Sequence, residues 1–82
     1  MTDARITSGQ VRAARQLLGW WQSDLAKMVR VSEKSIRAFE SGELSGPSLD
    51  LDLVREVIEG AGVIFVEENG EGPGVRLRKA GQ

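Results

Sequence analysis

Polar and small side chains share one face of the stretch that follows Ser32. In a helix over residues 33–41, a turn of 100° per residue puts Ser35, Ile36 and Phe39 on one side. The other side holds Glu33, Lys34, Arg37, Ala38 and Ser41. A lysine can donate to guanine O6 and N7, a glutamate can accept from cytosine N4, and an alanine can contact a thymine methyl group. Their clustering favours contact with a DNA groove over the alternative of ordinary solvated surface.

Two short predicted helices, joined by a three-residue turn, position these side chains. In the first, over 22–29, apolar residues recur at the spacing of an amphipathic helix. They are Leu25, Ala26, Met28 and Val29. Ser32 can cap a second helix over about 33–41, and Gly42 can end it in the left-handed conformation. Two helices that cross at a tight turn are the geometry that sets a helix into the major groove of DNA.

Nine residues of this region recur at the spacing of a known motif. They are Gln22, Leu25, Ala26, Val31, Ser32, Ser35, Ile36, Glu40 and Gly42. Together they resemble the helix-turn-helix of the Cro/C1-type (XRE) repressor family, over roughly residues 11–62. The resemblance implies a mainly α, lambda-repressor-like fold of four to five helices, here followed by a C-terminal β-hairpin.

Two positions depart from the family pattern. Arg30 stands where the family usually has glycine, which predicts either a positive φ, at a cost of about 1–2 kcal/mol, or a remodelled turn. Trp21 stands where a serine or threonine usually caps the first helix of the motif, and an indole cannot cap through a side-chain oxygen.

The resemblance also implies roles for individual residues. Base contacts are expected from Ser32, Glu33, Lys34, Arg37 and Ala38, with Arg37 able to serve a base or a phosphate. Phosphate contacts are expected from Gln22, Trp21, Arg30 and Ser41. For Trp21, donation to a phosphate and contact with a protein partner stay equally open. Arg15 aligns with a family position that pairs with Glu40, which predicts a structural ion pair; two independent surface charges are the alternative.

The first helix is predicted over 8–18 and stops at Gly19. Thr7 and Gln10 have the spacing of a capping box. The apolar stripe that follows consists of Val11, Ala14, Leu17 and Leu18. Residues 1–6 are predicted to be a mobile tail, and Trp20 to continue the core. Beyond a loop over 43–47, Ser48 is predicted to cap a fourth helix with Asp50 and Asp52 in its first turn, where the helix dipole favours acids.

The C-terminal part reads as a β-hairpin, with strands over 63–66 and 75–78 and a turn over 68–74. A lone hairpin is marginally stable in water, and its first strand is apolar on both faces. We therefore expect a homodimer in which the hairpins meet; a strand packed only on its own subunit is the alternative. The expected interface consists of Ile64, Phe65, Val66, Val75 and Leu77. The domain boundaries become tail 1–6, DNA-binding domain 7–62, hairpin 63–79 and tail 80–82.

Composition limits the chemistry. The 82 residues suffice for one domain, and the chain has neither histidine nor cysteine. We therefore expect no enzymatic activity, no catalytic residues, no metal and no cofactor. The net charge of −1 is unevenly distributed: residues 5–42 hold seven basic side chains against three acids, and residues 43–72 hold one against eight. No apolar run is long enough for a membrane span, and no signal peptide is evident, so a cytoplasmic protein is expected.

The function expected from these observations is sequence-specific regulation of transcription. A homodimer would bind double-stranded DNA at an inverted repeat, with recognition helices in successive major grooves about 34–36 Å apart. Repression, activation and autoregulation are all open. The rival interpretation is a protein-binding regulator, such as an antitoxin or anti-activator, that grips a protein partner through Trp21, Leu44 and the acidic fourth helix.

Overall fold

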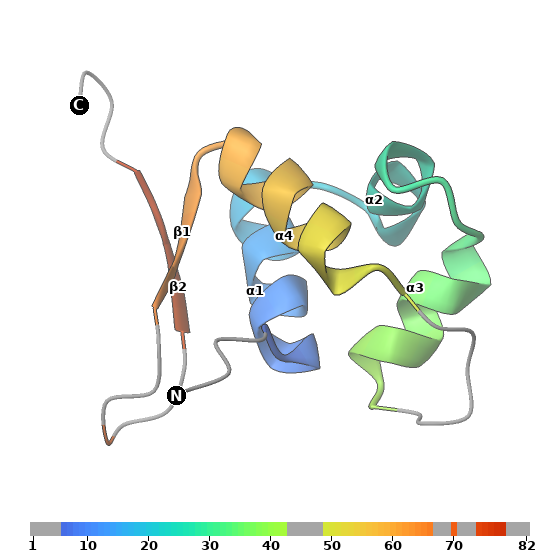
Figure 1. Ribbon diagram of the computed structural model, residues 1–82, viewed down its shortest axis with the longest axis horizontal. Helices are drawn as coiled ribbons and strands as arrows, with labels where there is room; N and C mark the ends of the chain where they lie inside the picture. The colour runs from blue at the N-terminus through green and yellow to red at the C-terminus, as the bar shows by residue number, and fades with distance from the viewer. Residues whose placement is uncertain (1–5, 43–48, 67–69, 71–73, 79–82) are drawn as a thin grey trace.

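The computed structural model describes residues 6–42, 49–66, 70 and 74–78. Within these ranges the chain forms four helices and one antiparallel hairpin (Figure 1). The elements are α1 (Ser8–Leu18), α2 (Gln22–Met28), α3 (Glu33–Glu40), α4 (Leu51–Gly60), β1 (Val63–Val66) and β2 (Gly74–Leu77). The mainly α fold with a C-terminal hairpin is confirmed. The predicted loop over 43–47, most of the predicted turn over 68–74, and the tail segments 1–5 and 80–82 lie outside the described residues.

Capping interactions explain where α1 begins and where α3 begins and ends. The Oγ1 of Thr7 accepts from the N–H of Gln10 at 3.1 Å, and the Oε1 of Gln10 accepts from the N–H of Thr7 at 2.9 Å. This is the predicted capping box. The Oγ of Ser32 likewise accepts from the N–H of Ser35 at 3.1 Å and begins α3. Gly42 follows that helix with a φ of 83°, which costs glycine little because it has no Cβ.

The start of α4 differs from the prediction. The Oδ1 of Asp50 accepts from the N–H of Leu53 at 3.1 Å, so Asp50 is the N-cap and Asp52 alone of the two acids lies in the first turn. The prediction that Ser48 caps this helix is wrong, and Ser48 itself lies outside the described residues. Aspartate caps a helix as well as serine does, so the sequence pattern allows both positions.

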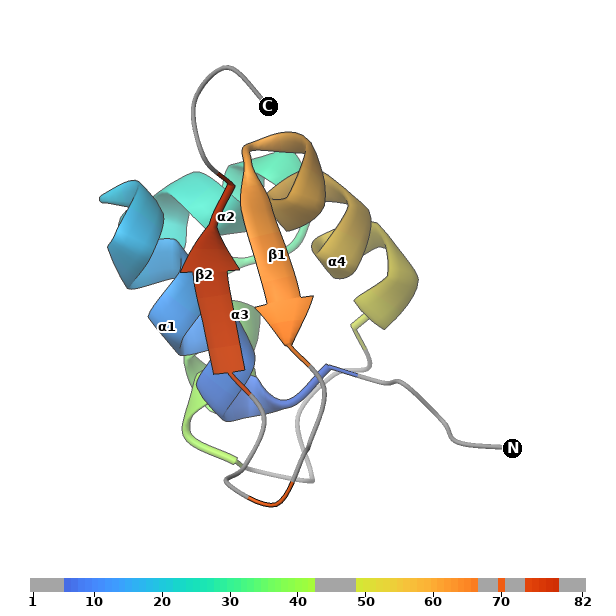
Figure 2. The ribbon, with the colours of Figure 1, turned by 90° about the vertical axis from the view of Figure 1, so that its left-hand side faces the viewer.

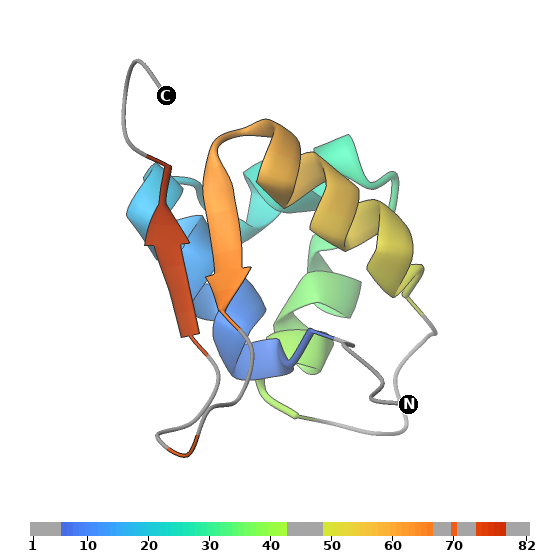
Figure 3. The same cartoon turned by 60° about the vertical axis from the view of Figure 1, so that its left-hand side comes forward.

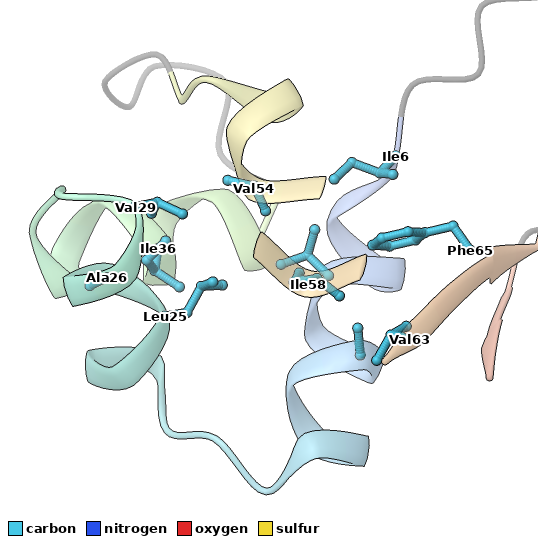
Figure 4. Packing of buried hydrophobic residues seen from close by; sticks show 11 residues of the cluster. Ile6, Leu25, Ala26, Val29, Ile36, Val54, Ile58, Val63 and Phe65 are labelled. Atoms are coloured by element: carbon cyan, nitrogen blue, oxygen red, sulfur yellow. The ribbon is translucent and has the colours of Figure 1, made fainter. Parts of the chain in front are cut away.

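The core lies between the helices and the inner face of the hairpin (Figure 4). Its largest fully buried side chains come from all four helices and β1. They are Leu25, Ile36, Ile58, Val11, Val54 and Val63. Phe65 points from β1 toward Ile58, which joins the hairpin to the same cluster. Trp20 packs against this core, as predicted.

Ile6 and Leu17 correct two expectations. Ile6, predicted to belong to the mobile tail, is 5% exposed and is part of the core. It directly precedes the N-cap Thr7, where an apolar residue packs back onto the first turn of a helix. Leu17, predicted to lie on the apolar stripe of α1, is 45% exposed. It lies about 60° around the helix from Ala14, at the margin of the buried face.

β1 and β2 pair with Val63 opposite Leu77 and Phe65 opposite Val75. Directly opposite residues share a face of a sheet, so these four side chains form the inner face. In Figures 2 and 3, β1 lies beside α4 and β2 lies beside α1. Phe65 is therefore a core residue of its own subunit, and its assignment to a dimer interface is corrected. Val75 also packs against this core.

The side chain of Gln10 ties the hairpin to α1. Its Nε2 donates to the carbonyl oxygen of Val66 at 3.2 Å and to that of Gly74 at 3.0 Å. Val66 and Gly74 are opposite each other in the register, so one amide group holds both strands at the end of the hairpin next to the turn. Gln10 is buried, and its Oε1 is already used in the capping box.

Candidate nucleic-acid interface

α2 and α3 pack against each other at the end of the molecule opposite the hairpin (Figure 1). Ser35 and Ile36 of α3 are buried against the rest of the domain, whereas Glu33, Lys34 and Arg37 are exposed. Ser41, directly after the helix, is exposed as well, and Ala38 is half-buried. The face chosen from a rotation of 100° per residue is thus the face that α3 turns to solvent.

The turn between α2 and α3 places Arg30 in the left-handed region. Its φ is 60°, and no other non-glycine residue among the described ranges has a positive φ. The N–H of Val31 donates to the carbonyl oxygen of Ala26 at 3.0 Å, which closes the end of α2 around this residue. The first of the two alternatives for Arg30 is therefore realised: the turn keeps the glycine-type geometry and arginine accepts its strain, about 1–2 kcal/mol. The side chain of Arg30 is exposed.

Arg15 and Glu40 form the ion pair expected between α1 and α3. The Nε of Arg15 donates to Glu40 Oε2 at 2.8 Å and a terminal nitrogen donates to Oε1 at 2.9 Å, so the contact is bidentate. The side chains are 11% and 2% exposed. The Nη1 of Arg15 also donates to the carbonyl oxygen of Trp20 at 2.9 Å. This buried pair fixes the angle between α1 and α3.

The hydrogen bond that Arg15 donates to Glu40 raises the pKa of the Arg15 guanidinium above its ordinary value, with burial acting in the opposite direction. A pKa that is raised in the folded state gives stability at every pH below the ordinary pKa of arginine. That stability is lost only as the pH rises through the folded-state pKa. Titration of Arg15 therefore leaves the fold unaffected across the neutral range.

Burial of Glu40 also changes the charge of the interface. Its carboxylate is neutralised by Arg15 and shielded from solvent, so it does not oppose an approaching phosphate. Four basic side chains, all exposed, stay on α2, the turn and α3; they are Lys27, Arg30, Lys34 and Arg37. Glu33 is the one exposed acid of the same segment. The surface is therefore more basic than the sequence count suggests.

Glu33 and Arg37 pair with each other across one turn of α3. A terminal nitrogen of Arg37 donates to Glu33 Oε2 at 3.2 Å, and the two side chains are largely exposed. An exposed i,i+4 pair contributes roughly 0.3–0.5 kcal/mol, so binding to DNA can break it at low cost. Two predicted base-contacting residues thus hold each other in the free protein, an arrangement that the sequence analysis does not foresee.

Two hydroxyl groups among the predicted contacts already have partners within the protein. Ser32 Oγ accepts from the Ser35 amide and lies 3.0 Å from Ser35 Oγ. Ser41 Oγ donates to the carbonyl oxygen of Ala38 at 3.0 Å. Each oxygen retains further hydrogen-bonding capacity, but its position is fixed by the helix that it caps.

The start of α2 holds Trp21 and Gln22. The N–H of Trp21 donates to Asp24 Oδ2 at 2.8 Å, which replaces the missing side-chain cap by the other half of a capping box. Trp21 as a whole residue is 75% exposed. Gln22 Nε2 donates to Glu40 Oε1 at 3.1 Å, so this predicted phosphate contact also belongs to the buried Arg15–Glu40 network.

The helix-turn-helix geometry agrees with a comparison against protein families, in which a helix-turn-helix model matches residues 11–51. The chain belongs to the Cro/C1-type helix-turn-helix (XRE) family, whose members are DNA-binding transcription regulators. In a comparison with curated proteins, none matches the chain. No group of three or more His, Cys, Asp or Glu side chains that could hold a metal ion occurs within the described ranges. Over the same ranges, no helix is long and apolar enough to cross a membrane.

Proposed function

We propose that this protein is a cytoplasmic, sequence-specific regulator of transcription that reads double-stranded DNA with α3. The observation that carries the proposal is the exposed face of α3, where Glu33, Lys34 and Arg37 project from a helix that is held by a buried ion pair. A rigid helix with a basic solvent face is what insertion into a major groove requires. By binding within a promoter, the protein would block polymerase.

Base reading and phosphate contact fall to different side chains. Lys34 donates to guanine O6 and N7, Glu33 accepts from cytosine N4, and Ala38 contacts a thymine methyl group. Trp21 and Arg30 flank the recognition helix at the start of α2 and in the turn, where they contact phosphates without reading sequence. Each good base contact discriminates by roughly 1–3 kcal/mol.

A gel-shift titration over salt tests the proposal. The logarithm of the affinity should fall linearly with the logarithm of the salt concentration, with a slope near −0.9 for each phosphate neutralised. Lys34→Ala should weaken binding and relax the sequence preference, whereas Trp21→Phe, which removes the indole N–H and keeps a smaller aromatic ring, should weaken binding to all sequences alike.

Arg12→Ala is the matched control. It also removes one positive charge from an exposed position, but it lies on α1, outside α2, the turn and α3. It should leave affinity and sequence preference unchanged. Equal effects of Lys34→Ala and Arg12→Ala would mean that binding responds to net charge alone, and the proposed groove contact would fail.

The homodimer is the second part of the proposal. Ile64 and Val66 lie on the outer face of β1, where no other described element of the same chain covers them (Figure 2). Because α3 and the hairpin lie at opposite ends of a molecule 34 Å long, a dimer built on the hairpin carries its recognition helices at its two outer ends. This geometry favours half-sites further apart than the single helical turn expected from the sequence.

One observation favours the rival function of gripping a protein partner: the exposed fraction of 75% for Trp21. Tryptophan is enriched in protein interfaces, and an exposed indole is an efficient anchor. Of the other two features of that rival, Leu44 lies outside the described residues, while Asp52 and Glu56 of α4 are exposed and Glu59 is half-buried. Trp21→Ala separates the functions, since loss of a protein complex with DNA binding retained would support the rival.

A further inference from the structure

The outer face of the hairpin combines an apolar centre with a basic margin. In the register of the two strands, Ile64 lies opposite Arg76 and Val66 lies opposite Gly74. Ile64 and Val66 are half-buried, whereas Arg76 and Arg78 are exposed. A two-stranded sheet of four residues per strand is too small to leave an apolar face in water without cost.

The opposite margin of the same surface is acidic. Arg55 of α4 lies 5.6 Å from the centre of the Phe65 ring, so it marks the side of the helix that adjoins β1. Because an α-helix turns by about 100° per residue, Glu59, Asp52 and Glu56 follow Arg55 in that order around the circumference of α4. Asp52 and Glu56 are exposed, and Glu59 pairs with Arg55 at 3.1 Å. β2, β1 and α4 follow one another in that order across this surface (Figure 2), so Arg76 lies on one side of the apolar strand β1 and the acids of α4 lie on the other.

The two charged margins also lie at the same position along the direction of the strands, which is called their height below. β1 follows α4 after two residues, and the N–H of Arg78 donates to the carbonyl oxygen of Gly62 at 2.7 Å. Arg76 and Arg78 are consequently level with the C-terminal half of α4, where Glu56 and Glu59 lie. No basic residue lies in the last turn of α4, although the negative end of a helix dipole favours one there.

We propose that a second copy of this chain covers the outer face of the hairpin, related by a two-fold axis that runs parallel to the strands and passes over β1. Rotation about such an axis exchanges the two margins and keeps their height. Arg76 and Arg78 of one protomer then face Glu56 and Glu59 of the other, while the Ile64 and Val66 side chains of both protomers meet at the axis. The inference rests on the proposed homodimer and assigns its symmetry and its polar contacts.

Charge excludes the other simple arrangement. A two-fold axis that also lies in the plane of the interface, but runs perpendicular to the strands, would set β2 against β2 and α4 against α4. Arginines would then face arginines and acids would face acids, and such juxtapositions are strongly unfavourable across an interface. The two arrangements bury the same apolar residues, so only the polar margins distinguish them.

Charge reversal followed by sedimentation equilibrium without DNA tests the axis. Arg76→Glu and Glu56→Arg should each raise the dimer dissociation constant about tenfold or more, and the double reversal should restore much of the loss. Lys34→Glu, a charge reversal at the opposite end of the molecule, should change nothing. Circular dichroism would establish that each variant is folded.

Other outcomes overturn the inference in distinct ways. If Arg76→Glu strengthens the dimer, arginines face each other and the axis is perpendicular to the strands. If the wild type stays monomeric at micromolar concentration, no second copy covers the hairpin. Because α3 takes no part in this measurement, DNA binding that still depends on Lys34 would show that only the dimer proposal has failed.

Discussion

The carboxylate of Glu40 accepts hydrogen bonds from both Arg15 and Gln22, so one buried acid near the end of α3 connects three helices. The connection joins the first helix, the start of α2 and the recognition helix. It holds the exposed face of α3 in a fixed orientation relative to the predicted phosphate contacts around Trp21. Its effect on function is therefore geometric, although its disruption is measured most directly as stability.

Glu40→Ala should destabilise the fold by about 3–5 kcal/mol, because it leaves the guanidinium of Arg15 buried without its partner. Urea unfolding followed by tryptophan fluorescence measures the change. The double variant Arg15→Met/Glu40→Leu should recover much of the loss, since it removes both charges and keeps the volume. A Glu40→Ala variant within 1 kcal/mol of wild type would mean that water reaches this site.

Arg30→Gly should stabilise the fold by up to about 1 kcal/mol. Glycine relieves the strain of a φ of 60°, about 1–2 kcal/mol, but the unfolded chain gains freedom that offsets part of it. Arg30→Ala, which keeps the strain and removes the same charge, is the control for stability. Both variants should reduce the salt dependence of DNA binding by about one phosphate. A salt slope equal to that of wild type would remove Arg30 from the phosphate contacts.

Glu33→Gln should increase affinity for unrelated DNA and narrow the difference between specific and unspecific binding. The change frees Arg37 from its pair at 3.2 Å and removes the one exposed acid of the interface. The stability should change by less than about 0.5 kcal/mol, because the pair is exposed. Competition gel shifts with random DNA measure the ratio of the affinity for the specific site to the affinity for unrelated DNA. Unchanged specificity would place Glu33 outside the groove.

Gln10→Leu should cost about 1–3 kcal/mol, because the carbonyl groups of Val66 and Gly74 lose their shared donor. Amide hydrogen exchange should then accelerate first at the end of the hairpin next to the turn. Gln16→Leu, a change at an exposed position of the same helix, is the control. Uniform acceleration over the whole domain would show that Gln10 supports the fold globally rather than the hairpin locally.

Selection of bound oligonucleotides from a random pool should enrich an inverted repeat whose half-site centres lie two helical turns apart, about 68–72 Å. A multiple of the helical turn keeps both recognition helices on one side of the duplex. The expected spacing between the half-site centres follows from the positions of α3 and the hairpin at opposite ends of a molecule 34 Å long. Enrichment of half-sites one turn apart would mean that the dimer forms through a different surface.

Local patterns in the sequence predict most of the fold because the capping signals and the helical periods agree. The capping box at Thr7, the cap at Ser32 and the span of β1 all follow from residues close in sequence. The cap of α4 could not be chosen in the same way, since Ser48 and Asp50 are both good caps and tertiary packing decides between them. The positive φ of Arg30 could be predicted only from the resemblance to the family, which usually has glycine there, because no local pattern alone indicates an arginine in the left-handed conformation.

The residues that the sequence analysis misjudges are those whose environment is supplied by distant segments. Ile6 is buried by the core, and Phe65 is turned inward by a strand register that the sequence leaves open. Gln10 carries one visible signal, a polar residue beside the apolar stripe of α1, but its second partner lies 64 residues further along the chain. For the interface, the exposed face of α3 follows from periodicity, whereas the pairing of Glu33 with Arg37 depends on side-chain rotamers.

The clamp of Gln10 on the hairpin has a consequence for how the protein is made. Gln10, in the first turn of α1, can donate its second side-chain hydrogen bond to the hairpin only when Gly74 is present. Val63 and Phe65, which complete the core, come from the same late segment of the chain. A chain still emerging from the ribosome therefore holds an unfinished domain until its hairpin, through Gly74, has also been synthesised. Truncation after residue 62 should leave a loosely packed species, even though α2 and α3 are intact.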